Sequence, residues 1–352
     1  MLVRYRTWGK KEREEMTRET RKLTTQGLTN MAFAFKQAGT LLTAIELDLF
    51  SKVSQGATTI PELGERLDLP YEVADKLVTA CAALGLLQKR DESYHNSAEV
   101  ERYLVRGAPK FYGDYLLFQA RSEYDTWKNL TPALRRPISP TGLYHTMMQD
   151  PEIARGITVA GYNSSIAAGR KLAREFDFSP YSLFLDLGGG SGCYSISACE
   201  SNQGLRAIVF DFPNVVTVAE EFIAKAGLSD RITTQAGDFT VDELPPGADL
   251  VGIIGNLHAY NPKETESVIE RAFQAVSPGG SLIVIDYMLN NERTGPLEAA
   301  LRHFEAAAYS SKGWVKTPAE ISEYMRRAGA TDIQTKDFIP GSLGWVTGKR
   351  SN

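Results

Sequence analysis

The chain has 352 residues and a formal net charge of −4. This length is enough for two hydrophobic cores, and the acidic balance disfavours a protein held mainly to nucleic-acid phosphates. No apolar run reaches the roughly 20 residues that span a bilayer, and the charged first residues lack the apolar centre of a secretory leader. The three cysteines form no C-x-x-C pair, which suits a reducing compartment. We therefore expect a soluble cytoplasmic protein that binds neither nucleic acid nor membrane.

The first 107 residues are predicted to form an arm and a small helical domain. Residues 1–25 are charged throughout and show no apolar face, as expected for a solvated arm. From Met31 to Phe50, apolar residues recur at helical spacing. They form an apolar stripe that a small domain has difficulty covering alone, which favours a homodimer made through the N-terminal helices. The stripe consists of Leu41, Leu42, Ile45, Leu49 and Phe50.

The rest of this domain has the pattern of a winged helix. A cap residue and a proline open a short helix within 58–63, and a second helix is predicted over 71–85. Two strand-like segments, 86–89 and 93–96, flank an Asp-Glu turn. In a DNA-binding protein the second helix would contact phosphates, which requires clustered basic residues. This helix carries one lysine and two acids, so the winged helix is predicted not to bind DNA.

Residues 108–180 are predicted to form a helical linker rich in aromatic side chains. Aromatic residues on helices pack into a core or line a pocket for a flat, apolar ligand. From residue 181 to residue 352 the pattern changes to strands that alternate with helices. This last segment is predicted to be a separate domain.

The most informative segment is an apolar strand, 183–187, that runs into the turn Gly-Gly-Gly-Ser-Gly at 188–192. Glycines there let the backbone approach a ligand closely, and the following helix directs its N–H groups outward. A second apolar strand ends in Asp211, where a carboxylate accepts hydrogen bonds from both ribose hydroxyls of a nucleoside. The third glycine of the dinucleotide fingerprint is replaced by Cys193 or Ser195, depending on the register. The segment therefore predicts a nucleoside cofactor and supports a dinucleotide only poorly.

Further strands follow at the spacing of βαβ units. One of them ends in Gly-Asp-Phe at 237–239, and the chain closes with a strand pair joined at Pro340-Gly341. We expect an α/β fold with a seven-stranded, doubly wound, Rossmann-like sheet whose ligand crevice lies at the carboxyl ends of the strands. The strands are predicted within 183–187, 207–211, 232–239, 248–258, 278–286, 331–337 and 343–349.

This order of motifs resembles the class I methyltransferases that use S-adenosylmethionine (SAM), in particular the small-molecule O-methyltransferases related to caffeate, hydroxyneurosporene and bacteriochlorophyllide methyltransferases. The resemblance covers roughly residues 28–350 and includes the form Asp-x-Gly-Gly-Gly-x-Gly, which begins at Asp186. It implies a dimerisation domain within 1–107, a helical roof over the acceptor within 108–180 and a SAM-binding domain over 181–352.

The resemblance also implies roles for individual residues. The cofactor would be held by Asp186, Gly188, Gly189, Gly190, Asp211, Phe212, Asp238, Phe239 and Asn256. The acceptor would be contacted by Phe118, Tyr162, Ile166 and His303.

A catalytic histidine is implied at His258, where imidazole would take the proton of a phenol near neutral pH. The aspartate and tryptophan that usually follow it are replaced by Ala259 and Tyr260. Val315 stands where the family has a glutamate that orients the histidine. A histidine without a carboxylate partner is a weaker and less oriented base, so these departures weaken the case for ordinary phenol O-methylation.

His303 is expected on the helix after the fifth strand, facing the acceptor pocket. Some resembling enzymes place a histidine in this region against a metal, and two imidazoles would need a further ligand, such as Glu305 or Asp286. We expect no metal, with a contact of His258 and His303 to a metal kept as the alternative.

These observations predict a homodimeric SAM-dependent methyltransferase that acts on an aromatic or polycyclic small molecule in secondary or pigment metabolism. Transfer to a hydroxyl is the leading reaction. Two alternatives stay open: C-methylation with a metal or metallated substrate at the two histidines, and a SAM-binding decarboxylase, hydroxylase or pericyclase on the same fold.

Overall fold

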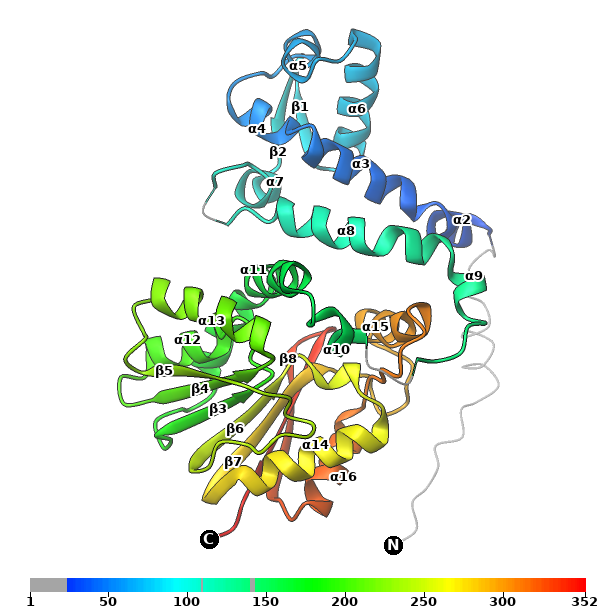
Figure 1. The fold of residues 1–352 in the computed structure, drawn as a ribbon. Helices are drawn as coiled ribbons and strands as arrows, with labels where there is room; N and C mark the ends of the chain where they lie inside the picture. Colours follow the sequence, from blue (N-terminus) through cyan, green and yellow to red (C-terminus); the bar gives the residue numbers. More distant parts are fainter. Residues whose placement is uncertain (1–23, 109, 140–142) are drawn as a thin grey trace, which may run out of the picture. The chain divides into compact units, whose positions relative to one another are not determined.

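The computed structural model describes residues 24–108, 110–139 and 143–352. The chain divides into two compact units, Met1–Leu117 and Phe118–Asn352, whose elements are labelled in Figure 1. The boundary between the units falls inside helix α8 (Gly113–Lys128). Most of the arm expected over residues 1–25 lies outside the described residues.

The first unit is a helical domain with a two-stranded wing, which confirms the winged-helix prediction. Helix α5 starts with a capping box in which Thr59 and Glu62 bond each other's backbone N–H groups, the arrangement that satisfies the free donors of a helix N-terminus. The wing is an antiparallel pair in which Leu87 lies opposite Asn96. The elements of this unit before α8 are α2 (Gln26–Ala32), α3 (Ala34–Glu46), α4 (Leu49–Ser54), α5 (Ile60–Leu67), α6 (Tyr71–Ala83), β1 (Leu87–Arg90), β2 (Ser93–Asn96) and α7 (Ala98–Tyr103).

The apolar stripe that was expected to lack cover belongs largely to the core of this unit. Ile45, Leu49 and Phe50 are at most 2% exposed, and Leu41 and Leu42 pack against the same cluster. The segment with helical spacing, Met31 to Phe50, is helical, but it is interrupted at Phe33 and again at Asp48, whose left-handed φ of 60° separates α3 from α4. The break lets α4 pack back against α3, so the apolar side chains of both helices enter one core. A group of large exposed apolar residues lies earlier, on α2 and around the start of α3: Leu28, Met31, Phe33 and Phe35.

The second unit is built on a seven-stranded sheet with the order β5-β4-β3-β6-β7-β9-β8. The first five strands in this order, β5 to β7, run parallel to one another. Strand β9 runs antiparallel to both of its neighbours, β7 and β8. This confirms the predicted sheet, and the order reverses between β3 and β6, where such sheets form their ligand crevice. The strands are β3 (Leu183–Leu187), β4 (Arg206–Asp211), β5 (Ile232–Ala236), β6 (Ala248–Ile254), β7 (Val276–Tyr287), β8 (Thr331–Ile339) and β9 (Leu343–Lys349).

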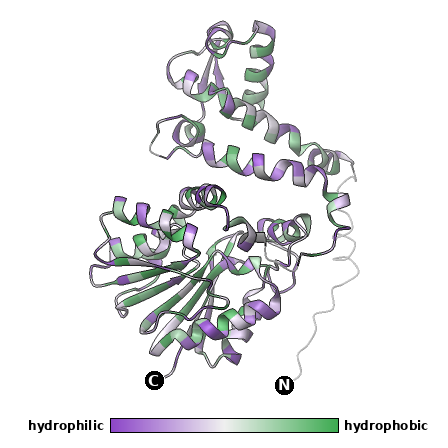
Figure 2. Cartoon of the chain, viewed as in Figure 1, coloured by the Kyte–Doolittle hydropathy of each residue, from purple (hydrophilic) through white to green (hydrophobic). Residues whose placement is uncertain are grey.

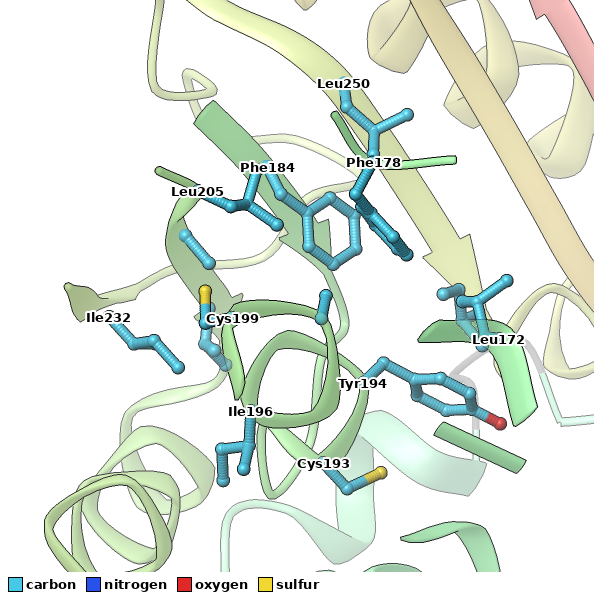
Figure 3. Packing of buried hydrophobic residues seen from close by; sticks show 14 of the residues in the cluster. Leu172, Phe178, Phe184, Cys193, Tyr194, Ile196, Cys199, Leu205, Ile232 and Leu250 are labelled. Carbon is cyan, nitrogen blue, oxygen red and sulfur yellow. The ribbon is translucent and has the colours of Figure 1, made fainter. Parts of the chain in front are cut away.

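Both faces of this sheet are buried, and successive side chains of a strand enter different cores. Phe184 packs with α11, α12 and α13, and its ring lies 6.1 Å from that of Phe178 (Figure 3). Leu185 and Leu187 point to the opposite face, where α14 and α16 pack. Burial on both faces explains why the central strands are apolar along most of their length (Figure 2).

The helices of the second unit complete these two layers. In the described residues, none of them combines the length and the apolar character needed to cross a bilayer. Their bounds are α9 (Leu130–Ala133), α10 (Leu143–Met147), α11 (Pro151–Glu175), α12 (Cys193–Ser201), α13 (Pro213–Lys225), the 3₁₀ helix η1 (Leu257–Ala259), α14 (Pro262–Ala275), α15 (Leu297–Ala308) and α16 (Pro318–Arg327).

The burial of β3 predicts a large cost for truncating one of its leucines. Leu185 is fully buried, whereas Leu297 is 74% exposed. Leu185→Ala should lower the free energy of unfolding by about 2–5 kcal/mol because it removes contacts and leaves a cavity. Leu297→Ala should change it by less than about 0.5 kcal/mol. Urea denaturation followed by circular dichroism measures both, and equal effects of the two substitutions would contradict this account of the core.

Candidate active site

The glycine turn after β3 is packed against protein on one side and open on the other. Gly188 and Gly190 have φ values of 65° and 57°, a region that favours glycine. A Cβ on Gly188 would lie 2.2 Å from the Nδ2 atom of Asn256, and one on Gly189 would lie 2.8 Å from the carboxyl carbon of Asp186. A Cβ on Gly190 would meet no atom within 4 Å among the described residues. The turn therefore offers bare backbone beside free space at Gly190.

Two buried oxygen atoms beside this turn have no hydrogen-bond donor among the residues that the structure describes. Asp186 is fully buried, and its Oδ2 accepts a bond of 2.7 Å from the hydroxyl of Ser195. Asn256 donates from Nδ2 to the carbonyl of Leu187 at 2.9 Å. Within the described part of the chain, Oδ1 of Asp186 and Oδ1 of Asn256 have no partner. Because an unpaired buried acceptor is costly, these two atoms fit a ligand that donates hydrogen bonds.

Asp211 connects the end of β4 to the same turn. It is 3% exposed. Its Oδ2 accepts the N–H of Gly190 at 2.8 Å, and its Oδ1 accepts the N–H of Phe212 at 2.7 Å. Each oxygen has a second lone pair, so the carboxylate is oriented and can still accept bonds from a ligand. Burial raises the pKa of Asp211 to about 6 and that of Asp186 to about 7, which favours a ligand that carries positive charge.

A cavity of about 380 Å³ is lined by the expected catalytic residue His258 and by two of the expected cofactor residues, Phe212 and Asp238. Its lining combines aromatic and aliphatic side chains with several charged groups. The lining consists of His145, Met147, Phe212, Asp238, Thr240, His258, Ala259, Tyr260, Glu264, Arg302, Glu305, Ala306, Tyr309, Ser311, Lys312 and Gly313.

Three further residues lie on or beside this cavity: His145, Asp238 and Phe239. His145 is exposed on the surface, and its ring lies 5.4 Å from that of Phe212 and lines the cavity. Asp238 lines the cavity and orients its carboxylate by accepting bonds from the backbone and hydroxyl of Thr240. Phe239 is buried behind the glycine turn, with its ring 5.6 Å from that of Tyr260.

His258 has a carboxylate partner after all. Its Nδ1 lies 2.8 Å from Oδ1 of Asp286, and its backbone N–H donates to Oδ2 of the same carboxylate at 2.8 Å. Asp286 stands near the end of β7 and is 3% exposed. Burial alone would raise the pKa of Asp286, but the attraction and hydrogen bonds of His258 hold that pKa below its usual value. The structure therefore corrects the expectation of an unsupported histidine.

The turn that carries His258 is also held from the segment after α15. Lys316 is 2% exposed, and its Nζ donates to the carbonyls of Leu257 and Tyr260, each at 2.6 Å. The backbone N–H of Trp314 donates to the carbonyl of His258 at 2.8 Å. Burial lowers the pKa of Lys316 to about 7, while the charge of Asp286 opposes that shift. These bonds fix the backbone on both sides of the histidine.

His303 does not line this cavity. Its Nδ1 accepts the N–H of Val315 at 3.2 Å, its Nε2 lies 3.4 Å from a guanidinium nitrogen of Arg293, and its ring is 4.6 Å from that of Trp314. Burial lowers the pKa of His303, and the charge of Arg293 adds to this effect. The structure thus differs from the expected orientation toward the acceptor pocket. Among the described residues, no three His, Cys, Asp or Glu side chains gather as a metal site would require.

The other three expected acceptor contacts also lie outside the lining of this cavity. Tyr162 stacks on Phe222 at 4.1 Å, and Ile166 packs against the same core. Phe118 is 37% exposed and lies beside Gly156. Their contact with an acceptor stays a prediction.

The chain is similar to known O-methyltransferases along most of its length. Residues 137–331 match the O-methyltransferase domain, and residues 29–106 match the O-methyltransferase dimerisation domain. The chain is 32% identical to 3-hydroxy-5-methyl-1-naphthoate 3-O-methyltransferase of Streptomyces sahachiroi, over 92% of this chain and 95% of that protein. It is 32% identical to the tetracenomycin polyketide synthesis 8-O-methyltransferase TcmO of Streptomyces glaucescens, over 88% and 92%. The fold matches the structure of human N-acetylserotonin methyltransferase in complex with SAM, with a TM-score of 0.81, 24% identity and coverage of 95% and 99%.

The buried carboxylates predict how SAM binding depends on pH. Because SAM is cationic, its affinity should rise between about pH 5 and pH 7 as Asp211 and Asp186 lose their protons. Asp211→Ala should weaken SAM binding about tenfold or more, since the ribose hydroxyls lose a charged acceptor, and should flatten the pH dependence. Isothermal titration calorimetry across this range measures both effects.

A matched control is Asp332→Asn, which alters an exposed carboxylate that pairs with Lys349 at 3.0 Å. This variant should bind SAM like the wild type. Unchanged SAM affinity in a folded Asp211→Ala variant would contradict the assigned role.

Proposed function

Because the chain belongs to the O-methyltransferase family and is a SAM-dependent methyltransferase, we propose that it methylates a hydroxyl group of an aromatic or polycyclic small molecule, with His258 as the general base. The observation that carries this proposal is the His258–Asp286 pair, which lies on a cavity that Phe212 and Asp238 also line.

The residues around the glycine turn fit SAM, which supplies a methyl group already activated by a positively charged sulfur. Asp211 would accept hydrogen bonds from the ribose hydroxyls. The free oxygens of Asp186 and Asn256 would accept from its donors, and bare backbone at Gly190 leaves room for it. Asp238 and Phe212 would bracket the adenine, one as an acceptor and the other through its ring face.

His258 has the arrangement of a general base. When Asp286 accepts the proton on Nδ1, the lone pair on Nε2 is left to take a proton from the acceptor hydroxyl. The buried carboxylate then stabilises the imidazolium that forms. Since the methyl donor is already activated, removal of the hydroxyl proton and alignment of the two reactants are what the chain has to provide.

The cavity and the relatives both support an aromatic acceptor. Met147, Phe212, Tyr260 and Tyr309 contribute large apolar surfaces to the lining, as suits a flat ligand. The names of the two Streptomyces relatives refer to a naphthoate and to polyketide synthesis, which supports a role in secondary metabolism. The metal-dependent C-methylation alternative is less favoured because Nδ1 of His303 accepts the backbone N–H of Val315 and the cationic guanidinium of Arg293 lies 3.4 Å from its Nε2.

We also propose a homodimer formed through the N-terminal helices. The match of residues 29–106 to a dimerisation domain supports it. So do the exposed apolar residues of α2 and the start of α3, because patches of this kind mark interaction surfaces.

The base assignment predicts a large and specific loss of activity. His258→Ala should reduce the methyl-transfer rate by about 10²–10⁴ and leave SAM affinity unchanged. Asp286→Asn should reduce the rate by a smaller factor, and His303→Ala should have a milder effect than either. Single-turnover assays that detect S-adenosylhomocysteine and the methylated product by mass spectrometry measure the rates.

The metal-dependent alternative predicts a different result. His258→Ala and His303→Ala would then lose activity equally, and a chelator would abolish the methyl-transfer rate of the wild type. An altered acceptor without S-adenosylhomocysteine would indicate a reaction other than methyl transfer.

The proposed dimer predicts a surface variant that dissociates. Leu28→Asp places a charge on a residue that is 71% exposed on α2 and should give a monomer in multi-angle light scattering. Val241→Asp, at a residue 70% exposed in the second unit, is the control and should remain dimeric. A wild-type protein that is monomeric at all accessible concentrations would contradict the proposal.

A further inference from the structure

Two cations line the cavity beside His258, and each is already paired with a carboxylate. Arg302 and Glu305 lie one turn apart on α15, with Nη1 and Oε2 2.7 Å apart. Lys312 bonds the carboxylate of Glu264. All four side chains belong to the lining. A ligand that enters the cavity therefore meets two neutralised ion pairs.

The first pair is held in place by its surroundings. The side chains of Arg302 and Glu305 are only 27% and 16% exposed. The guanidinium of Arg302 also lies over the ring of Tyr287, 5.0 Å from its centre. Burial raises the pKa of Glu305, and the charge of Arg302 opposes this shift. The positive charge of Arg302 is thus committed to groups of the protein, because a partly buried ion pair is costly to break.

The summed charge of the cavity lining also disfavours a negatively charged acceptor. Besides the two pairs, Asp238 adds a third carboxylate to the lining, and the remaining titratable side chains with a possible positive charge are His145 and His258. Apart from the two imidazoles, three carboxylates and two cations leave the lining with one excess negative charge, which the net positive charge of SAM offsets. A carboxylate on the acceptor would then face two carboxylates at short range without a free cation.

We propose that the acceptor of this enzyme is an uncharged aromatic compound, unlike the naphthoate in the name of the Streptomyces sahachiroi relative, and that Glu305 and Glu264 exclude acceptors that carry a carboxylate. The Arg302–Glu305 pair offers a donor and an acceptor side by side, which suits neighbouring hydroxyl and carbonyl or ester oxygens on a ring system. This inference rests on the proposed function of the cavity as the acceptor site.

The test compares two probes that share one ring system, 3-hydroxy-2-naphthoate and its methyl ester, in which a methyl group removes the negative charge of the carboxylate. Their affinities are measured by calorimetry on the full chain saturated with S-adenosylhomocysteine, so that no turnover occurs. The wild type should bind the ester about tenfold or more tightly than the acid, because like charges at short range repel. Glu305→Gln keeps the side-chain shape and frees Arg302, so the preference should shrink or invert.

Two further variants make this test specific. Glu264→Gln frees Lys312 and keeps a residue that can complete the capping box of α14, so it should shift the preference in the same direction. Glu221→Gln is the matched control, because Glu221 pairs with Arg155 at 2.7 Å on the exposed surface, outside the cavity. It should leave the ratio of the two affinities unchanged.

Tighter binding of the acid than of the ester by the wild type would overturn the inference while leaving the proposed aromatic acceptor site in place. An unchanged ratio in both Glu305→Gln and Glu264→Gln, with melting temperatures like the wild type, would overturn it as well. If neither probe bound at millimolar concentration, the proposed class of acceptor would fail, and this inference with it.

Discussion

The candidate site depends on one buried carboxylate at the end of a sheet strand. Strands β6 and β7 are parallel neighbours in which Ile254 pairs with Ile285, so the residues that follow each strand emerge at the same edge. This register brings Asp286 to the turn that holds His258. A carboxylate buried to this extent costs several kcal/mol unless charges and donors compensate it, and His258 provides both a backbone and a side-chain donor. The stability of the strand end and the orientation of the base are therefore linked.

Buried carboxylates that need donors also lie on the other side of the point where the strand order reverses, in β3 and β4. Asp186 lies in β3, Asp211 ends β4, and both are buried beside the glycine turn. Backbone N–H groups orient Asp211, whereas one oxygen of Asp186 has no donor within the described residues. Burial raises the pKa of both carboxyl groups. In the function that we propose, a cationic nucleoside ligand would supply the missing donors and charge at this edge of the sheet.

Much of the second unit could be predicted from the sequence because its determinants are local. All seven strands lie close to their predicted positions, since apolar runs, glycines and acids at strand ends follow from βαβ packing. The helical spacing from Met31 to Phe50 does not show where the helices end. The segment is divided among α2, α3 and α4, and Asp48 adopts a left-handed conformation that periodicity does not reveal.

The partner of His258 could not be found in the same way. The resembling family has its acids at positions 259 and 315, which are Ala259 and Val315 in this chain. The carboxylate comes instead from the neighbouring strand, and only the register of β6 with β7 shows this. His303 differs from its expected orientation because of helix phase. Arg302, Glu305, Ala306 and Tyr309 line the cavity from one face of the α15 region, and a residue one position from Arg302 is turned by about 100° around the helix axis.

The tautomer of His258 tests the central interaction most directly. The chain has four histidines, so ring nitrogens are resolved by two-dimensional ¹H–¹⁵N NMR and assigned with His258→Gln. The account predicts that the neutral ring carries its proton on Nδ1, bonded to Asp286, with Nε2 unprotonated toward the cavity. In Asp286→Asn this preference should be lost. A neutral wild-type ring that carries its proton on Nε2 would show that Asp286 does not orient His258 as a base.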